Sequence, residues 1–268
     1  MDQRPIGIFD SGLGGLTCVK KVMELLPGED IIYFGDTGRV PYGTRSAETV
    51  MKYVRQNIRF LKTFDIKYII IACGTASSAA LPLIQEEWDI PIAGVLEPTC
   101  RAAAKATRNG KVGVLGTQGT IRSGKYEEKL MKLNPQLQVT SRACPMFVPL
   151  VENGYLESEA TNLIAREYLL PLKEQGVDTL ILGCTHYPLL KPMISKIMGE
   201  GVTLIDAGAE TAFHAKEYLK EQGLLNGQLQ GRVQYYVSDG VEGFTSLAGM
   251  FLEKEIQGSV NDVAIENY

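Results

Sequence analysis

The sequence predicts an α/β protein of two pseudo-symmetric lobes, each a mostly parallel sheet flanked by helices, with the functional site in the cleft between them. Short apolar runs alternate with helical patterns along all 268 residues. The runs are rich in Val and Ile and almost continuously apolar, as expected for parallel strands covered on both faces. Two strand motifs also recur, in the same order, in the two halves of the chain. The alternation indicates open parallel sheets, and the recurrence indicates two similar units.

Eight apolar runs are predicted as strands. In chain order they are Ile6–Phe9, Ile31–Phe34, Tyr68–Ala72, Ile92–Val95, Val112–Leu115, Thr179–Leu182, Val202–Ile205 and Val233–Val237. Amphipathic helices lie between them, and the clearest is Ser46–Phe64. Val50, Val54 and Ile58 fall on one face of that helix, and Ser46 is placed to cap its first turn.

The internal repeat has two parts. IGIFDSG at Ile6–Gly12 corresponds to VGVLGTQ at Val112–Gln118, and YIIIACGTA at Tyr68–Ala76 corresponds to TLILGCTHY at Thr179–Tyr187. Buried strands resemble one another by chance, so the apolar pattern alone is weak evidence. Both copies of the second motif also end in a Cys with a Thr close behind it, which favours a true repeat.

The repeat and the short connections between its halves predict the lobe boundaries. The connections Leu96–Thr99 and Asp206–Thr211 leave no room for a linker, so the chain is expected to cross between lobes twice. The first lobe is predicted to comprise residues 1–98 plus 213–268, and the second residues 99–212.

Composition excludes several classes of protein. The formal net charge of −4 gives no reason to expect binding to nucleic acid or to an anionic membrane. The N-terminus lacks the pattern of a signal peptide and no run of 18 apolar residues occurs, so we expect a cytoplasmic protein with no membrane span. The five cysteines are odd in number, widely spaced and without a C-x-x-C pair, which indicates free thiols and no structural metal site.

Polar residues follow five of the predicted strands. These clusters are Asp10-Ser11-Gly12, Gly35-Asp36-Thr37, Cys73-Gly74-Thr75, Gly116-Thr117 and Cys184-Thr185-His186. Because sites in parallel α/β sheets form at the carboxyl ends of strands, the clusters are expected to line one cleft. Thr117 is included among the candidate substrate-binding residues on this ground.

Cys73 and Cys184 are the strongest catalytic candidates. Each ends a buried strand beside a Thr, where a helix is expected to begin, and a helix N-terminus lowers a thiol pKa below its usual value of about 8.5. Two thiols from facing lobes would flank one carbon, so that one removes a proton while the other supplies one. That is inversion at a stereocentre without a cofactor. The other cysteines are interpreted as small buried hydrophobic residues; they are Cys18, Cys100 and Cys144.

Five further ionisable residues are interpreted as functional or structural by their positions. His186 lies two residues after Cys184 and can tune its proton, whereas His214 falls in a helical pattern and is interpreted as structural. Asp10 is interpreted as functional in preference to a plain helix cap. For Asp36 and Glu152 the functional and structural interpretations are equally favoured. The glycines that follow Ser11 lack the spacing of a dinucleotide loop, and a turn that binds a carboxylate fits them better.

The chain resembles the glutamate racemase family, within the aspartate/glutamate racemase superfamily, over nearly its whole length. The motifs that carry the resemblance are GIFDSGLGGLT near the start, YFGDTGRVPYG at Tyr33–Gly43, IIIACGTAS at Ile69–Ser77, GVLGTQGT at Gly113–Thr120 and LILGCTHYPLL at Leu180–Leu190. The resemblance implies two pseudo-symmetric lobes with the active site between them, no cofactor, and supply of D-glutamate for peptidoglycan, cell-wall biogenesis and cell shape. It also implies a homodimer.

The resemblance assigns roles to positions of this sequence. Its proton-transfer cysteines correspond to Cys73 and Cys184. Its assisting acid–base groups correspond to Asp10, Glu152 and His186. Its substrate-binding positions correspond to Asp10, Ser11, Tyr42, Gly43, Gly74, Thr75, Thr185 and His186.

One position departs from the family. After the first cysteine the family has Cys-Asn-Thr, whereas this chain has Cys73-Gly74-Thr75. An Asn offers a donor and an acceptor to the substrate, and the loss of one hydrogen bond to a charged ligand costs roughly 1.5–3 kcal/mol. Ser77, Ser78 or a water is available to replace it. Restoring Asn at position 74 therefore has two opposite expected outcomes, namely a gain in glutamate binding or a clash in a reshaped pocket.

Two alternatives to a glutamate racemase are open at this point. The first is a racemase of aspartate or another amino acid; a decarboxylase or other isomerase is disfavoured because both strand-end cysteines are present. The second is a catalytically weakened amino-acid-binding regulatory protein, against which the two thiols argue.

Overall fold

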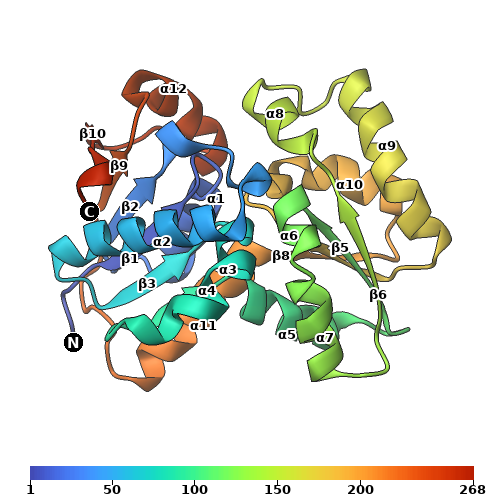
Figure 1. Cartoon of the computed structure of the whole chain (residues 1–268), viewed down its shortest axis with the longest axis horizontal. Coiled ribbons are helices and arrows are strands. Elements are labelled where there is room, and N and C mark those ends of the chain that lie inside the picture. Colours follow the sequence, from blue (N-terminus) through green and yellow to red (C-terminus); the bar gives the residue numbers. More distant parts are fainter.

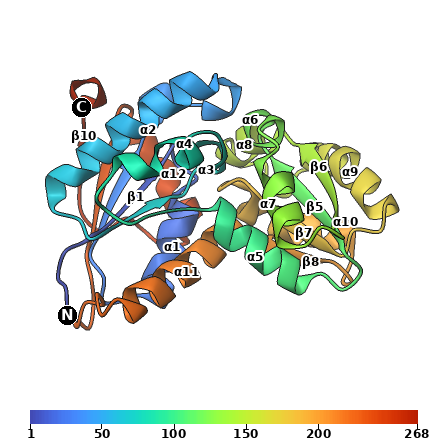
Figure 2. The same cartoon turned by 60° about the horizontal axis from the view of Figure 1, so that its bottom comes forward.

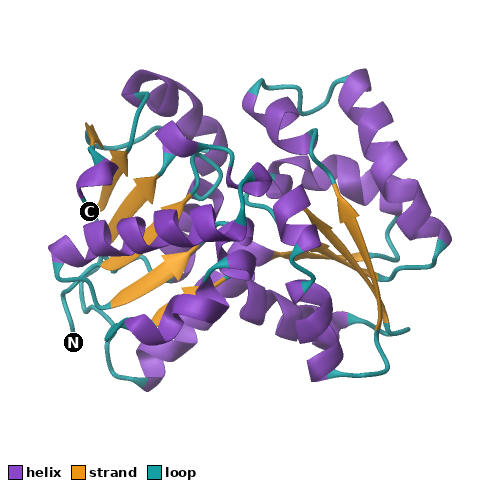
Figure 3. Cartoon of the chain, viewed as in Figure 1, coloured by secondary structure: helices purple, strands orange, loops and turns teal.

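The computed structural model describes all residues from Met1 to Tyr268 and contains two separate parallel sheets (Figures 1 and 3). The first sheet has six strands in the order β10-β9-β2-β1-β3-β4, and the second has four in the order β6-β5-β7-β8. Every strand pairing is parallel. The strands are β1 Ile6–Asp10, β2 Ile31–Gly35, β3 Tyr68–Ile71, β4 Ile92–Gly94, β5 Lys111–Gly116, β6 Gln138–Ala143, β7 Thr179–Leu182, β8 Thr203–Asp206, β9 Val233–Val237 and β10 Val260–Asp262.

The two sheets share one topology. The order β2-β1-β3-β4 in the first sheet matches the order β6-β5-β7-β8 in the second, strand for strand. The repeated motifs therefore lie on equivalent strands, β1 with β5 and β3 with β7. The predicted α/β class with two pseudo-symmetric lobes is confirmed, and β9 and β10 extend the first sheet alone.

Helices flank both faces of each sheet (Figure 2). Those that cover the first sheet are α1 Leu16–Leu25, α2 Ala47–Leu61, α3 Gly74–Ala79, α4 Leu81–Ile84, α11 Ala207–Glu221 and α12 Val241–Leu252. Those of the second sheet are α5 Leu96–Ala106, α6 Gln118–Arg122, α7 Lys125–Leu133, α8 Phe147–Glu152, α9 Glu159–Glu174 and α10 Lys191–Met198. Short 3₁₀ turns occur at Thr37–Arg39, Tyr42–Thr44, Lys62–Phe64, Gln85–Glu87, Tyr187–Leu190 and Ile265–Asn267.

Strand β1 shows how alternate side chains build two cores. Ile8 packs with the apolar side chains of α1, α11 and α12, whereas its neighbour Phe9 packs with those of α2 and α3 on the other face. The first of these cores continues without a break into the second lobe, where it includes Leu182 and Tyr187. This shared core packs the two lobes against each other below the strand ends.

The lobe boundaries remain a proposal. The strands of each sheet fall within the predicted residue ranges, but the boundary at residue 213 lies inside α11. That helix leaves β8 of the second sheet and packs along α1 and α5. No helix is both long and apolar enough to cross a membrane.

The eight predicted strands are all present, and two strands were missed. Gln138–Ala143 lies at the edge of its sheet with no fully buried residue, and Val260–Asp262 is a three-residue edge strand. Neither shows the continuous apolar pattern of a central strand. The predicted helix at Ser46–Phe64 divides into α2, which Ser46 caps by accepting a hydrogen bond from the Thr49 N–H, and a final 3₁₀ turn.

Candidate active site

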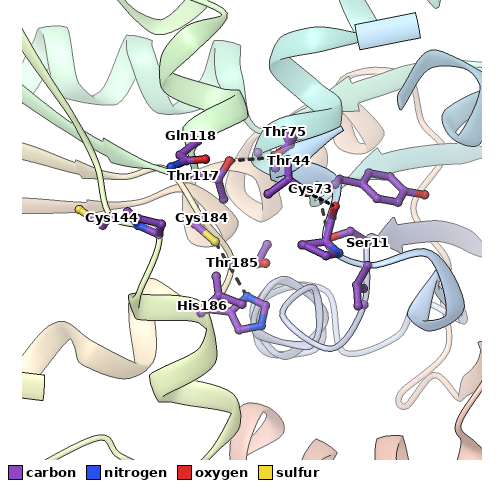
Figure 4. Close-up of a pocket in the computed structure, with 18 of the residues that line it drawn as sticks. Ser11, Thr44, Cys73, Thr75, Thr117, Gln118, Cys144, Cys184, Thr185 and His186 are labelled. Carbon is purple, nitrogen blue, oxygen red and sulfur yellow. Dashed lines mark hydrogen bonds between the residues drawn. The ribbon is translucent and has the colours of Figure 1, made fainter. Parts of the chain in front are cut away.

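The carboxyl ends of the central strands of both sheets face one cavity of about 360 Å³ (Figure 4). Its walls come from loops and helix starts of both lobes. They comprise Ser11, Gly12, Val40, Pro41, Tyr42, Gly43, Thr44, Cys73, Gly74, Thr75, Thr117, Gln118, Cys144, Pro145, Val148, Pro149, Glu152, Gly183, Cys184, Thr185 and His186. Every predicted site residue is therefore in this wall except Asp10, which lies directly behind it.

Cys73 lies on the first-lobe side of the cavity. It occupies the N-cap position of α3 and is 5% exposed, so only a small part of the thiol reaches the cavity. Its Sγ donates a weak hydrogen bond to the Ser11 Oγ at 3.7 Å. Asp10 lies behind Ser11, fully buried; one carboxylate oxygen accepts from the Gly15 N–H at 2.8 Å, and the other has no partner.

Burial decides the protonation of this side. It raises the pKa of the Asp10 carboxyl, against the lowering effects of nearby His186 and of backbone N–H groups. Burial, with the Asp10 charge, also raises the pKa of Cys73 to about 12. The prediction that the helix N-terminus lowers this thiol pKa is wrong. The Ala76 N–H does act in that direction, but α3 is only six residues long and desolvation outweighs it.

Cys184 lies on the second-lobe side, two residues after the end of β7. It is 8% exposed, and its Sγ is 3.9 Å from the His186 Nδ1. The other ring nitrogen of His186 is 2.9 Å from Glu152 Oε1, at the C-terminal end of α8. No α-helix begins at Cys184, contrary to the prediction; a 3₁₀ turn starts at Tyr187 instead.

His186 carries a positive charge next to the second thiol. Burial alone would lower the pKa of its ring, but hydrogen bonds and charges from Cys184 and Glu152 outweigh burial and raise that pKa to about 10. The ring is therefore protonated at neutral pH and has an N–H for each partner. The side chains of Cys184, His186 and Glu152 form a continuous hydrogen-bonded chain.

The remaining predicted binding residues form the walls between the thiols. Gly43 contributes backbone from the turn Tyr42–Thr44, while the Tyr42 hydroxyl turns away and donates to Asp36. Thr75 and Thr117 come from opposite lobes, and their hydroxyl oxygens are 2.9 Å apart (Figure 4). Asp36 lies outside the cavity wall and accepts from Arg39 and Ser238, which identifies it as structural.

Sequence reasoning missed several wall residues. Gln118 directly follows a strand-end cluster and was within reach of the same argument, whereas Thr44 and the α8 residue Val148 carry no such signal. Cys144 was interpreted as a buried hydrophobic residue; it is fully buried, but it also borders the cavity, and its sulfur contacts the Arg142 carbonyl. His214 is exposed on α11, away from this cavity.

The serines expected to replace a missing Asn side chain are occupied elsewhere. Ser77 donates to the Ile71 carbonyl and accepts from the Val95 N–H. Ser78 donates to the Gly74 carbonyl, and neither serine borders the cavity. Position 74 therefore offers the cavity only backbone.

The fold and site together define a class: a two-lobed α/β enzyme with a thiol from each lobe in a shared cavity. The model of the Asp/Glu/Hydantoin racemase family matches residues 7–215, and the chain belongs to that family.

Within the family, the chain is a glutamate racemase, an isomerase of amino acids. It is 50% identical over 267 residues to the glutamate racemase of Geobacter metallireducens, covering 99% of this chain and 98% of that protein. The crystal structure of a Bacillus anthracis glutamate racemase superposes with a TM-score of 0.94 at 42% identity, covering 98% of each chain. The Francisella tularensis glutamate racemase in complex with D-glutamate gives a TM-score of 0.93 at 40% identity, covering 100% of each chain.

Proposed function

We propose that this racemase interconverts L- and D-glutamate by two-base proton transfer between Cys73 and Cys184, without a cofactor. The observation that carries the proposal is the placement of the two thiols in one cavity, each from a different lobe. Relatives solved with D-glutamate, from Francisella tularensis, and with L-glutamate, from Escherichia coli, support glutamate as the substrate in both hands.

The reaction needs one thiolate and one thiol. The thiolate takes the α-proton of the bound amino acid and becomes a thiol, leaving the electron pair on the α-carbon. The opposing thiol then gives its proton to the other face of that carbon and becomes a thiolate. The configuration is inverted, no group is gained or lost, and the enzyme ends in the complementary protonation state, ready for the reverse direction.

Each thiol has its own assisting groups in this proposal. Asp10 and Ser11 serve Cys73. The Ser11 hydroxyl accepts a hydrogen bond from the thiol, and the protonation state of the buried Asp10 carboxyl affects how readily Cys73 becomes a thiolate. Glu152 and His186 serve Cys184, because the imidazolium places a positive charge beside the sulfur and the carboxylate orients the ring.

Substrate binding is assigned to the groups between the thiols. The backbone N–H groups and hydroxyls there can donate to the carboxylates of glutamate, and the hydroxyl oxygens can accept from its ammonium group. The proposed set is Asp10, Ser11, Tyr42, Gly43, Gly74, Thr75, Thr117, Thr185 and His186. Tyr42 and Gly74 contribute through their backbone.

The biological role follows from the product. We propose a cytoplasmic enzyme, acting as a homodimer, that supplies D-glutamate for peptidoglycan and so supports cell-wall biogenesis and cell shape. Chiral chromatography of L- and D-glutamate, and of L- and D-aspartate, tests the substrate. Purified enzyme treated with a chelator and a carbonyl-trapping reagent is expected to racemise only glutamate. Preference for aspartate, or activity that requires an added cofactor, would contradict the proposal.

A further inference from the structure

The backbones of the two lobes meet at Gly74 and Gly183, between the two thiols. A Cβ atom placed on Gly74 would lie 2.3 Å from the Gly183 carbonyl oxygen and 3.3 Å from its carbon. Ordinary van der Waals contact for a Cβ atom begins at about 3.4 Å. Helix α3 and the loop after β7 are therefore closer here than any side chain at position 74 permits.

In this chain the constraint on position 74 is close approach and not backbone conformation. Gly74 is the first residue of α3 and does not adopt the left-handed conformation that favours glycine. The Gly74 carbonyl also has a contact that is common in helices: it accepts a hydrogen bond at 2.8 Å from the hydroxyl of Ser78, four residues later. The requirement is steric and comes from the opposite lobe.

The two glycines adjoin the two catalytic candidates in sequence. Gly74 directly follows Cys73, and Gly183 directly precedes Cys184. Each segment is also fixed to its own lobe: the Gly183 N–H donates to the Leu115 carbonyl at 2.8 Å, and the Ala72 N–H, just before Cys73, donates to the Phe9 carbonyl at 2.9 Å. Neither segment can retreat without breaking these hydrogen bonds.

Hydrogen bonds between the lobes hold this contact closed. The hydroxyl of Thr75, next to Gly74, is 2.9 Å from that of Thr117 and 3.4 Å from that of Thr120. On the other side of Cys184, the Thr17 hydroxyl of the first lobe is 2.9 Å from the Thr185 carbonyl. The glycine contact is thus accompanied by two polar contacts between the lobes, one at Thr75 and one at Thr185.

We infer that Gly74 is a positioning residue that sets the separation of Cys73 and Cys184. Its missing side chain lets the two thiol-bearing segments touch, so the cleft closes to a fixed width around the α-carbon. The inference rests on the proposed two-cysteine reaction. A methyl group at position 74 must move the segments apart by about 1 Å to restore normal contact. A misplacement of this size costs a reaction about 10²-fold.

This inference decides between the two outcomes expected for Asn at position 74. The side chain that could add a hydrogen bond to the substrate first collides with the Gly183 backbone carbonyl. The clash therefore outweighs a hydrogen bond, and the variant is expected to lose activity.

The test compares Gly74→Ala with the parent enzyme and with the control Gly243→Ala. Gly243 lies in α12 with open space around it, so its substitution reports the effect of alanine alone. Gly74→Ala is expected to lower kcat about 10²-fold in both directions while KM changes by less than about threefold. The control is expected to keep parental kinetics.

A distance measurement accompanies the kinetics. Bifunctional methanethiosulfonates of increasing spacer length are reacted with each protein, and the Cys73–Cys184 cross-link is quantified by peptide mass spectrometry. The optimum spacer is expected to lengthen in Gly74→Ala and to stay unchanged in Gly243→Ala. Parental kcat or an unchanged optimum in Gly74→Ala would overturn the inference, while inactivity of the cysteine variants would still support the two-cysteine reaction. An unfolded Gly74→Ala protein, seen by circular dichroism, would also overturn it by assigning Gly74 to folding.

Discussion

The two sides of the cavity hold chemically equivalent thiols in opposite electrostatic surroundings. Cys73 lies near the buried Asp10 carboxyl, and its hydrogen-bond partner is the neutral hydroxyl of Ser11. Burial raises the pKa of this thiol to about 12. Cys184 adjoins His186, whose ring is protonated at neutral pH and bound to Glu152. The lobes repeat a topology, but the repeat does not extend to the ionisable groups beside each thiol.

This difference suggests how a symmetric reaction runs on an asymmetric site. The two enantiomers of glutamate are equally stable, so kcat/KM must be the same in both directions whatever the residues. The electrostatic surroundings of the two thiols can therefore differ, provided that the two proton transfers together give one overall barrier. Asymmetry should appear in which proton transfer limits the rate and not in the equilibrium.

The largest expected effect comes from removing either thiol. Cys73→Ala and Cys184→Ala should each lower racemisation of both enantiomers by about 10³-fold or more, because each direction of the proposed reaction uses both thiols. Cys100→Ala is the matched control, since Cys100 is buried outside the cavity. It should lose some stability but keep its activity. Near-parental turnover in either active-site variant would show that one thiol suffices.

The next effect distinguishes the two sides. His186→Asn removes the cation beside Cys184 and should lower kcat/KM about 10²-fold, equally in both directions. The primary isotope effect with α-deuterated glutamate should rise only for the enantiomer whose proton Cys184 removes. Asp10→Asn should raise it for the opposite enantiomer. Isotope effects that change alike for both enantiomers would mean that these residues do not serve separate thiols.

The smallest effect is on stability against pH. The pKa of His186 is raised from 6.5 to about 10 in the folded protein, so its contribution to stability is complete below about pH 6.5. That contribution declines as the pH rises toward about 10, because the folded chain alone still binds the proton. The Tm difference between parent and His186→Asn should shrink by several degrees over this range. A Tm difference that stays constant with pH for His186→Asn would refute the assignment.

The sequence was sufficient to predict the central strands and the polar residues that follow them at the cavity. Continuous apolar runs marked β1, β2, β3, β5 and β7 most clearly because these strands are buried along nearly their whole length, and parallel topology then brings their carboxyl ends together. Edge strands such as Gln138–Ala143 escaped because only partial burial shapes their pattern. The two omitted strands, β6 and β10, each lie at the edge of a sheet.

Electrostatics and close contacts could not be predicted in the same way. The position of Cys73 at a helix start suggested a lowered pKa, but the sign depends on how completely the folded chain excludes water from the thiol. Gly74 was interpreted as the loss of a ligand contact, whereas its main neighbour is a carbonyl of the other lobe. Both quantities depend on atoms that are distant in sequence.

Hydrogen exchange at the α-carbon tests the central claim most directly. L-Glutamate is incubated with the enzyme in D2O, and both enantiomers are separated at low conversion and analysed by mass spectrometry. Two thiols on opposite faces predict deuterium in the D-glutamate formed and almost none in the L-glutamate that remains, with the reverse pattern when D-glutamate is the substrate. A product that keeps the original proton, or deuterium in product and remaining substrate alike, would show that one base serves both faces and would contradict the account.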